Sequence, residues 1–259
     1  MSRTKILFTT KIFVNTYFVL NKAKIEVFNT IMKGEILMSK KIYLSPSMQS
    51  NNMYAYGGTN EMIECNKIAQ AAKNALERCG FDVKKAPQGQ STLQSVKESN
   101  AWNTDLHIPI HTNAFNGETL GGTLVMIYSM DTENKKAGQA LLDAVSAVSP
   151  GPDYALRENC SLVELNSTKA VAVYVEVEFH DTISGATWII DNTEIIGEAI
   201  AKGVCSYFGV TYKENSSVSS GKIYRVQIGA FSQKSNAENC LEKAKSAGFT
   251  DTFIVEAYL

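Results

Sequence analysis

All three histidines of this 259-residue chain lie in two short apolar segments that also carry glutamates. His107 and His111 belong to residues 105–114 (DLHIPIHTNA), and His180 follows Glu176 and Glu178 in residues 173–182 (VYVEVEFHDT). Histidine and carboxylate side chains are common zinc ligands and common groups for proton transfer near neutral pH. The pattern therefore predicts a metal site or an acid–base site.

Strand periodicity places these side chains on defined faces. Every second residue of 171–179 is apolar, so Glu176 and Glu178 are predicted on the face opposite those apolar residues. In the other segment, His107 and His111 share one face, and the opposite face carries Leu106, Ile108 and Ile110. His111 then lies at the C-terminal end of its strand, where open α/β sheets bind ligands. His107 is predicted to be a structural histidine.

Strand-like and helix-like segments alternate after residue 38. Strands are expected at 41–45, 81–83, 106–111, 121–128 and 171–179, and helices at 61–79, from Ser91, and at 133–148, 183–192 and 193–208. Repeated strand–helix units predict an α/β fold, with a mostly parallel sheet flanked by helices on both faces.

The motifs and their order resemble those of the type 3 zinc-dependent N-acetylmuramoyl-L-alanine amidases. Residues 108–114 (IPIHTNA) match that family's Ser-Ile-His-x-Asn-Ala strand end, 175–179 (VEVEF) match its Val-Glu-x-Gly-Phe strand, and 59–61 (TNE) match its glutamate at a helix start. The family cuts the bond between muramic acid and the first residue of the peptidoglycan stem peptide. The resemblance therefore implies a Zn²⁺ cofactor and bacterial peptidoglycan as the substrate.

The same resemblance implies roles for individual residues. Glu61 and His111 are expected to bind zinc, Glu176 to be the catalytic acid–base group, and Asn113 to contact the substrate. Glu178 is expected either to orient a ligand or to raise the pKa of Glu176 by charge repulsion.

One family ligand is missing. Residues 45–49 (SPSMQ) place Met48, or Gln49 with a one-residue shift, where the family has its first zinc-binding histidine. A thioether is a poor zinc ligand and an amide oxygen is a weak one. The third ligand therefore stays open between His180 and Gln49, and loss of a stable zinc site is a further alternative.

The C-terminal region predicts a second module. Residues 212–221 (YKENSSVSSG) are polar and serine-rich, which is typical of a flexible linker. Residues 222–259 predict a small βαβ module with strands at 223–232 and 252–255, and 226–231 (VQIGAF) resembles the sporulation-related repeat (SPOR) domain. That family binds peptidoglycan glycan strands, which implies glycan contacts for Gln227 and Phe231. The catalytic domain is expected at 38–211.

Residues 1–37 differ from the rest and are predicted to be a translated leader or a disordered extension, with Met38 as the start. Lys11 and Asn15 interrupt the apolar run at 5–20, so neither a signal peptide nor a stable membrane insertion is expected. We therefore expect a protein made in the cytoplasm and released to act on the cell wall, as an endolysin or autolysin is.

Composition agrees with this interpretation. A net charge of −1 gives no support to nucleic-acid binding. The five scattered cysteines have no metal or redox spacing and are expected to be reduced core residues.

Two alternatives to the amidase remain. The chain could be a non-catalytic wall-binding protein that has lost its metal, or a metal-dependent peptidase that cuts the stem peptide. Glu176 argues against the first, because a binding protein has no use for a carboxylate on that face.

Overall fold

The described residues form a six-stranded mixed sheet. The computed structural model describes residues 39–117, 121–152, 154–215, 228–249 and 252–254. The strands are β1 (Lys41–Pro46), β2 (Asp82–Lys85), β3 (Leu106–Asn113), β4 (Leu124–Ile127), β5 (Ala155–Glu158) and β6 (Val171–Phe179), in the order β2-β1-β3-β6-β4-β5. Only β4 and β6 pair antiparallel; the other neighbours are parallel. The predicted mostly parallel sheet is confirmed.

Four of the seven described helices begin after a side chain that caps them. The helices are α2 (Glu61–Arg78), α3 (Thr92–Trp102), α4 (Thr132–Ser146), α5 (Val163–Asn166), α6 (Ile183–Asp191), α7 (Thr193–Phe208) and α8 (Lys234–Ser246). Asn60 accepts a hydrogen bond from the Ile63 amide at 3.0 Å, and Ser91 caps α3 in the same way. Neither β5 nor α5 is predicted from the sequence, because β5 has no buried residue to mark an apolar face and α5 is a single helical turn.

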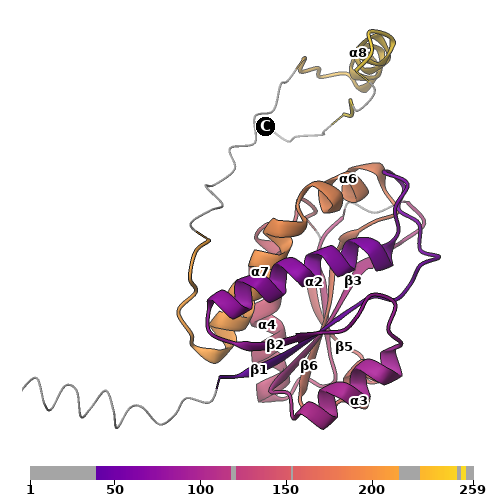
Figure 1. The fold of residues 1–259 in the computed structure, drawn as a ribbon. Coiled ribbons are helices and arrows are strands. Elements are labelled where there is room, and N and C mark those ends of the chain that lie inside the picture. The colour runs from indigo at the N-terminus through magenta and orange to yellow at the C-terminus, as the bar shows by residue number, and fades with distance from the viewer. Residues whose placement is uncertain (1–38, 118–120, 153, 216–227, 250–251, 255–259) are drawn as a thin grey trace, which may run out of the picture. The chain divides into compact units, whose positions relative to one another are not determined.

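Helices cover both faces of the sheet, as predicted. Helices α2, α4 and α7 pack on one face, over the main apolar core that contains Ile108, Val173 and Val175 (Figure 1). Short α5 and part of α3 cover the other face, where the alternate residues Tyr43 and His107 point. The strand alternation expected from the sequence thus puts apolar side chains on one face and histidines on the other.

Helices α2 and α7 pack closely because their contact is lined by small residues. A Cβ atom added at Gly197 of α7 would lie 2.5 Å from Ala71 Cβ and 2.6 Å from the Ala72 amide nitrogen, both in α2. Neither neighbour is the end of a flexible side chain. The two helices would therefore have to separate to admit a methyl group.

We expect Gly197→Ala to lower the free energy of unfolding by roughly 1 to 3 kcal/mol, since overpacking outweighs the gain in helix propensity. Urea unfolding followed by circular dichroism measures the change. Ser206→Ala, at an exposed position of the same helix, is the control and is expected to stay within about 0.5 kcal/mol of the parent. A Gly197→Ala protein as stable as the parent would contradict the close contact.

The structure describes residues 228–249 and 252–254 of the predicted C-terminal module. The predicted helix is confirmed as α8, in which Ala244 is buried. The described parts of the two predicted strands, 228–232 and 252–254, form no strand. So short a unit has little apolar surface to bury, which weakens strand pairing. Gln227, residues 216–221 of the predicted linker and residues 1–37 lie outside the described residues.

The cysteine prediction needs a correction. All five are free thiols, and Cys65, Cys79 and Cys205 are buried as expected, but Cys160 is exposed and Cys240 is partly exposed. Cys160 follows β5 at the sheet edge, where core packing ends.

Within the described part of the chain, every helix is too short or too polar to cross a membrane.

Candidate active site

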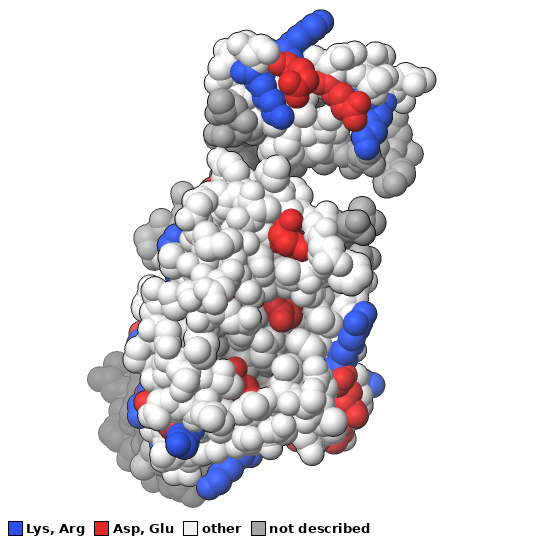
Figure 2. Space-filling view, turned by 90° about the vertical axis from the view of Figure 1, so that its right-hand side faces the viewer, with Lys and Arg blue, Asp and Glu red and all other residues white. Residues whose placement is uncertain are grey.

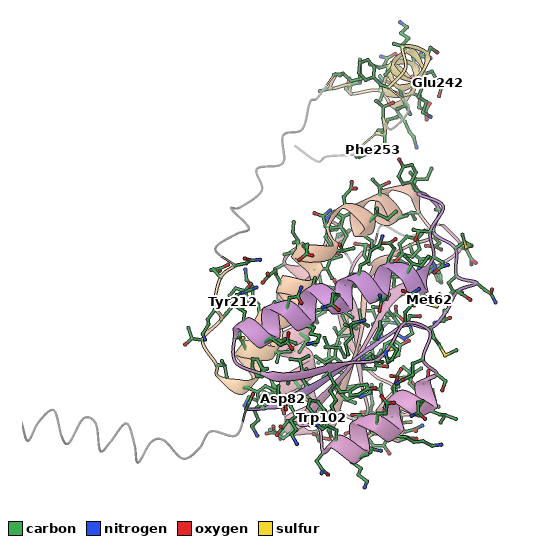
Figure 3. All side chains as sticks on the ribbon, viewed as in Figure 1. Met62, Asp82, Trp102, Tyr212, Glu242 and Phe253 are labelled. Atoms are coloured by element: carbon green, nitrogen blue, oxygen red, sulfur yellow. The ribbon has the colours of Figure 1, made fainter. Side chains whose placement is uncertain are left out.

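The end of β3 and the start of α2 bring Glu61 and His111 together. Glu61 Oε1 lies 2.7 Å from His111 Nδ1, and the Thr112 amide donates to the same oxygen at 3.4 Å. Glu61 is only 1% exposed and is the first residue of its helix, where the helix dipole favours negative charge. Met62, the next residue, marks this end of α2 in Figure 3, far from Asp82 at the start of β2.

The loop after β1 adds two amide side chains. Gln49 Nε2 lies 3.3 Å from His111 Nδ1. Asn52 Nδ2 donates to Gln49 Oε1 at 2.8 Å and to Glu61 Oε2 at 2.7 Å. Gln49, Asn52, Glu61 and His111 thus form one cluster, whereas the Met48 side chain is 41% exposed.

His180 faces a different set of partners. Its Nδ1 atom lies 2.9 Å from Thr112 Oγ1 and 3.1 Å from the Thr112 carbonyl oxygen, and its ring stacks on Tyr54 with 5.0 Å between centroids. The structure therefore brings Gln49, and not His180, into contact with His111.

Glu176 lies on β6 opposite His111 in the register of the two parallel strands. Its Oε2 atom is buried without a hydrogen-bond partner among the described residues. Burial raises the pKa of Glu176 to about 7; the nearby His111 opposes this rise and the charge of Glu61 adds to it. A carboxyl group with a pKa near 7 can both accept and donate a proton at neutral pH.

The pKa values of the Glu61–His111 pair shift in opposite directions. Burial acts to lower the pKa of His111, but the Glu61 hydrogen bond and the charges of Glu176, Glu61 and Glu164 raise it overall. Burial acts to raise the pKa of Glu61, but its bonds to His111, Asn52 and Ser47 lower it overall. Tyr174 stacks on His111 with 4.4 Å between centroids and so limits rotation of the imidazole.

Glu178 and Asn113 have other contacts. Glu178 accepts hydrogen bonds from the Gly122 amide at 2.7 Å, from Ser149 Oγ at 2.5 Å and from the Gly151 amide at 3.3 Å. These bonds hold the loops before β4 and β5, and none of them involves His180, a ligand that Glu178 is expected to orient. The alternative expectation, a rise in the pKa of Glu176 through Glu178, finds no support, because burial and Glu61 raise that pKa. Asn113 Oδ1 accepts from the amide of Ala114 at 2.9 Å.

A cavity of about 620 Å³ opens beside the cluster. The loop after β1, the start of α3 and the start of α5 form its walls, together with the rings of His111 and Tyr174. The lining residues are Met48, Gln49, Ser50, Asn51, Asn52, Thr92, His111, Leu162, Val163, Glu164 and Tyr174. Figure 2 shows this end of the domain, with acidic side chains among uncharged ones in the middle of the face and Lys and Arg toward its edges.

Three residues at this site were not predicted from the sequence. Asn52 and Tyr174 lie outside the matched motifs. Tyr174 is two positions before Glu176 in the same strand, so the strand period could have placed it on the face of the site. Glu164 belongs to the four-residue helix α5, for which the sequence has no periodic signal.

The contacts of this cluster bear on whether it can hold a zinc ion. A single imidazole nitrogen cannot both donate to Glu61 and accept from Gln49, whereas a cation between the three side chains would satisfy all of them once the amide turns its oxygen inward. Carboxylate and imidazole are usual zinc ligands, and the amide is a weak one. Within the described ranges, no three His, Cys, Asp or Glu side chains are placed to hold a metal. The residues therefore fit zinc only with Gln49 as the third ligand and with reduced affinity.

Two family models match this chain. The family model described as N-acetylmuramoyl-L-alanine amidase matches residues 46–206, and the SPOR domain model matches residues 220–258. An uncharacterized 38.4 kDa protein of Clostridium perfringens is 29% identical over 162 residues, which are 58% of this chain and 46% of that protein. The sporulation-specific N-acetylmuramoyl-L-alanine amidase of Bacillus subtilis (strain 168) is 26% identical over 224 residues, covering 83% of this chain and 85% of its own length.

The fold has a solved counterpart. The structure of the N-acetylmuramoyl-L-alanine amidase AmiC2 of Nostoc punctiforme aligns with a TM-score of 0.59 at 14% identity, over 66% of this chain and 97% of that one. At this identity the likeness concerns the fold alone. The first family model, however, spans more than half of the sequence and contains Glu61, His111 and Glu176. This chain therefore belongs to the N-acetylmuramoyl-L-alanine amidase family.

Proposed function

We propose that this protein hydrolyses the amide bond between N-acetylmuramic acid and L-alanine in bacterial peptidoglycan. The observation that carries the proposal is Glu176, a carboxyl group with a pKa near 7 and an unpartnered buried oxygen, opposite the Glu61–His111 pair. Family membership indicates the reaction class, and the match of residues 220–258 to the SPOR domain points to the same polymer.

Zinc is the cofactor that we propose, held by Glu61, His111 and Gln49. Bound there, it would supply a Lewis acid that polarises the scissile carbonyl and lowers the pKa of water. Asn52 would keep Glu61 in place through its hydrogen bond to Oε2. Tyr174 and Glu61 would keep the His111 ring oriented.

Glu176 would move the protons of the reaction. Its carboxylate accepts a proton from the attacking water, whose oxygen forms a bond to the lactyl carbonyl carbon. The same group then returns that proton to the nitrogen as the carbon–nitrogen bond breaks, and the stem peptide leaves with a free alanine amine. We place Asn113, at the end of β3, among the groups that contact the substrate.

The C-terminal module would hold the enzyme on its substrate. We propose that residues 222–259 bind glycan strands, with Phe231, which is 48% exposed, and Gln227 at the contact. The division into a catalytic domain at 38–211, a linker at 212–221 and this module stays a prediction. We propose the cell wall as the place of action.

Incubation with purified peptidoglycan tests the function. New alanine N-termini that disappear with a chelator and return with zinc are expected, because the water needs Lewis-acid activation. New N-termini of other residues would identify a stem-peptide peptidase. Wall binding without any new N-termini would contradict the hydrolase and support a binding protein.

A further inference from the structure

Glu164 lines the cavity and has one carboxylate oxygen that bonds to no described residue. The residue lines the cavity wall and is 4% exposed. Its Oε1 atom lies 3.1 Å from His107 Nε2. Its Oε2 atom has no hydrogen-bond partner in the described part of the chain and, unlike Glu176 Oε2, is not sealed from solvent. A buried carboxylate ordinarily uses both oxygens, so this oxygen can accept a hydrogen bond from a ligand that enters the cavity.

His107 anchors this carboxylate. The histidine is fully buried, and its ring stacks on Tyr43 with 5.3 Å between centroids and 7° between planes. Its Nδ1 atom has no partner among the described residues, so the ring hydrogen belongs on Nε2, which donates to Glu164 Oε1. The pair therefore fixes the position of Glu164 and leaves Oε2 as an acceptor.

The remaining lining sets the charge of the ligand. None of the described residues that line the cavity is Lys or Arg, and those other than Glu164 and His111 are neutral polar or apolar. A ligand carboxylate placed directly against Glu164 would meet a like charge, which is unfavourable at a buried site, whereas the positive charge that we propose in this cavity, the zinc ion, is held at Gln49 and His111. An ammonium group would form a charge-assisted hydrogen bond there. The volume of about 620 Å³ suits a short peptide segment.

We propose that Glu164 binds a primary ammonium group of the substrate, so that the cavity selects stem peptides with a free side-chain amine over those whose amine is acylated. The inference rests on the proposed function, because it takes the stem peptide as the ligand. The amine is that of the diamino acid of the stem, which becomes an amide when two stems are cross-linked. The enzyme would thus favour stems that are not cross-linked through this amine.

Binding measurements on the full chain with Glu176→Gln test the proposal without turnover. The probes are a synthetic muramyl tripeptide that ends in lysine and the same compound acetylated on the lysine side chain. Titration calorimetry is expected to give about tenfold weaker binding for the acetylated probe, as loss of a charge-assisted hydrogen bond requires. Adding Glu164→Gln is expected to abolish the preference, since the amide oxygen still accepts from His107 but carries no charge.

Glu77→Gln is the matched control, because Glu77 is an exposed carboxylate on α2 that pairs with Lys73. It should keep the tenfold preference. Equal binding of the two probes by the protein that retains Glu164 would overturn the inference, even if the Glu164→Gln protein does not fold. A preference that survives Glu164→Gln would also overturn it.

Hydrolysis by the protein with Glu176 intact separates this inference from the proposed function. A lower KM for the free-amine probe than for the acetylated probe supports both. Cleavage of both probes with the same KM overturns the amine subsite alone. Amine-dependent binding without any cleavage supports the subsite and contradicts the hydrolase.

Discussion

Glu176→Gln is expected to lower kcat for peptidoglycan hydrolysis by about 10³-fold while wall binding is kept, because the amide cannot accept or return the proton of the attacking water. The substitution preserves the shape of the side chain. It breaks no hydrogen bond at Oε2, because that atom accepts none from the described residues. Release of alanine N-termini measures the rate, and co-sedimentation with peptidoglycan measures binding. A variant with unchanged kcat would exclude Glu176 as the acid–base group.

The same variant should be more stable than the parent above pH 7 when zinc is absent. Burial raises the pKa of Glu176 from 4.5 to about 7. The folded state therefore holds the proton more tightly than the unfolded state, and stability is lost as the pH rises from about 4.5 through 7. Removing the carboxylate should restore up to roughly 3 kcal/mol at pH 8 and almost nothing at pH 4.

Glu178→Gln is the matched control on the same strand. Its carboxylate accepts several hydrogen bonds from loop backbone and Ser149. The substitution should therefore destabilise the protein at both pH values. Denaturant unfolding in the presence of a chelator distinguishes the two patterns. Stabilisation by Glu178→Gln, or none by Glu176→Gln at pH 8, would contradict the described environments.

Gln49→His is expected to tighten zinc binding by about 100-fold, since an imidazole is a far better zinc ligand than an amide. Gln49 is already in contact with His111, and Asn52 holds it beside Glu61. Competition with a chromophoric chelator at pH 7.5 measures the affinity directly, without reliance on activity. Hydrolysis should then become resistant to chelator concentrations that inactivate the parent.

Met48→His controls for the register of this loop. Met48 is 41% exposed and makes no part of the Gln49–His111 contact, so its replacement should leave zinc affinity unchanged. Tighter binding in Met48→His and not in Gln49→His would show that the other register supplies the third ligand. A loss of zinc in His180→Ala, with Gln49→His without effect, would assign the third ligand to His180.

The sequence alone predicted the α/β architecture and the faces on which the main site residues lie. Side chains of a strand alternate between two faces whatever its neighbours are, so the positions of His111 and Glu176 relative to the apolar core follow from residue spacing. The starts of α2 and α3 follow from Asn60 and Ser91 for a similarly local reason, since a cap bonds to an amide three residues ahead.

Which side chains meet across the site was decided by the tertiary structure. Gln49 and His180 were equal alternatives in the sequence, and the loop after β1 brings only Gln49 to His111. The pairing of His107 with Glu164 joins residues 57 positions apart through a helix of four residues. Local periodicity carries no information on such pairs, because loop paths and packing between distant elements place them.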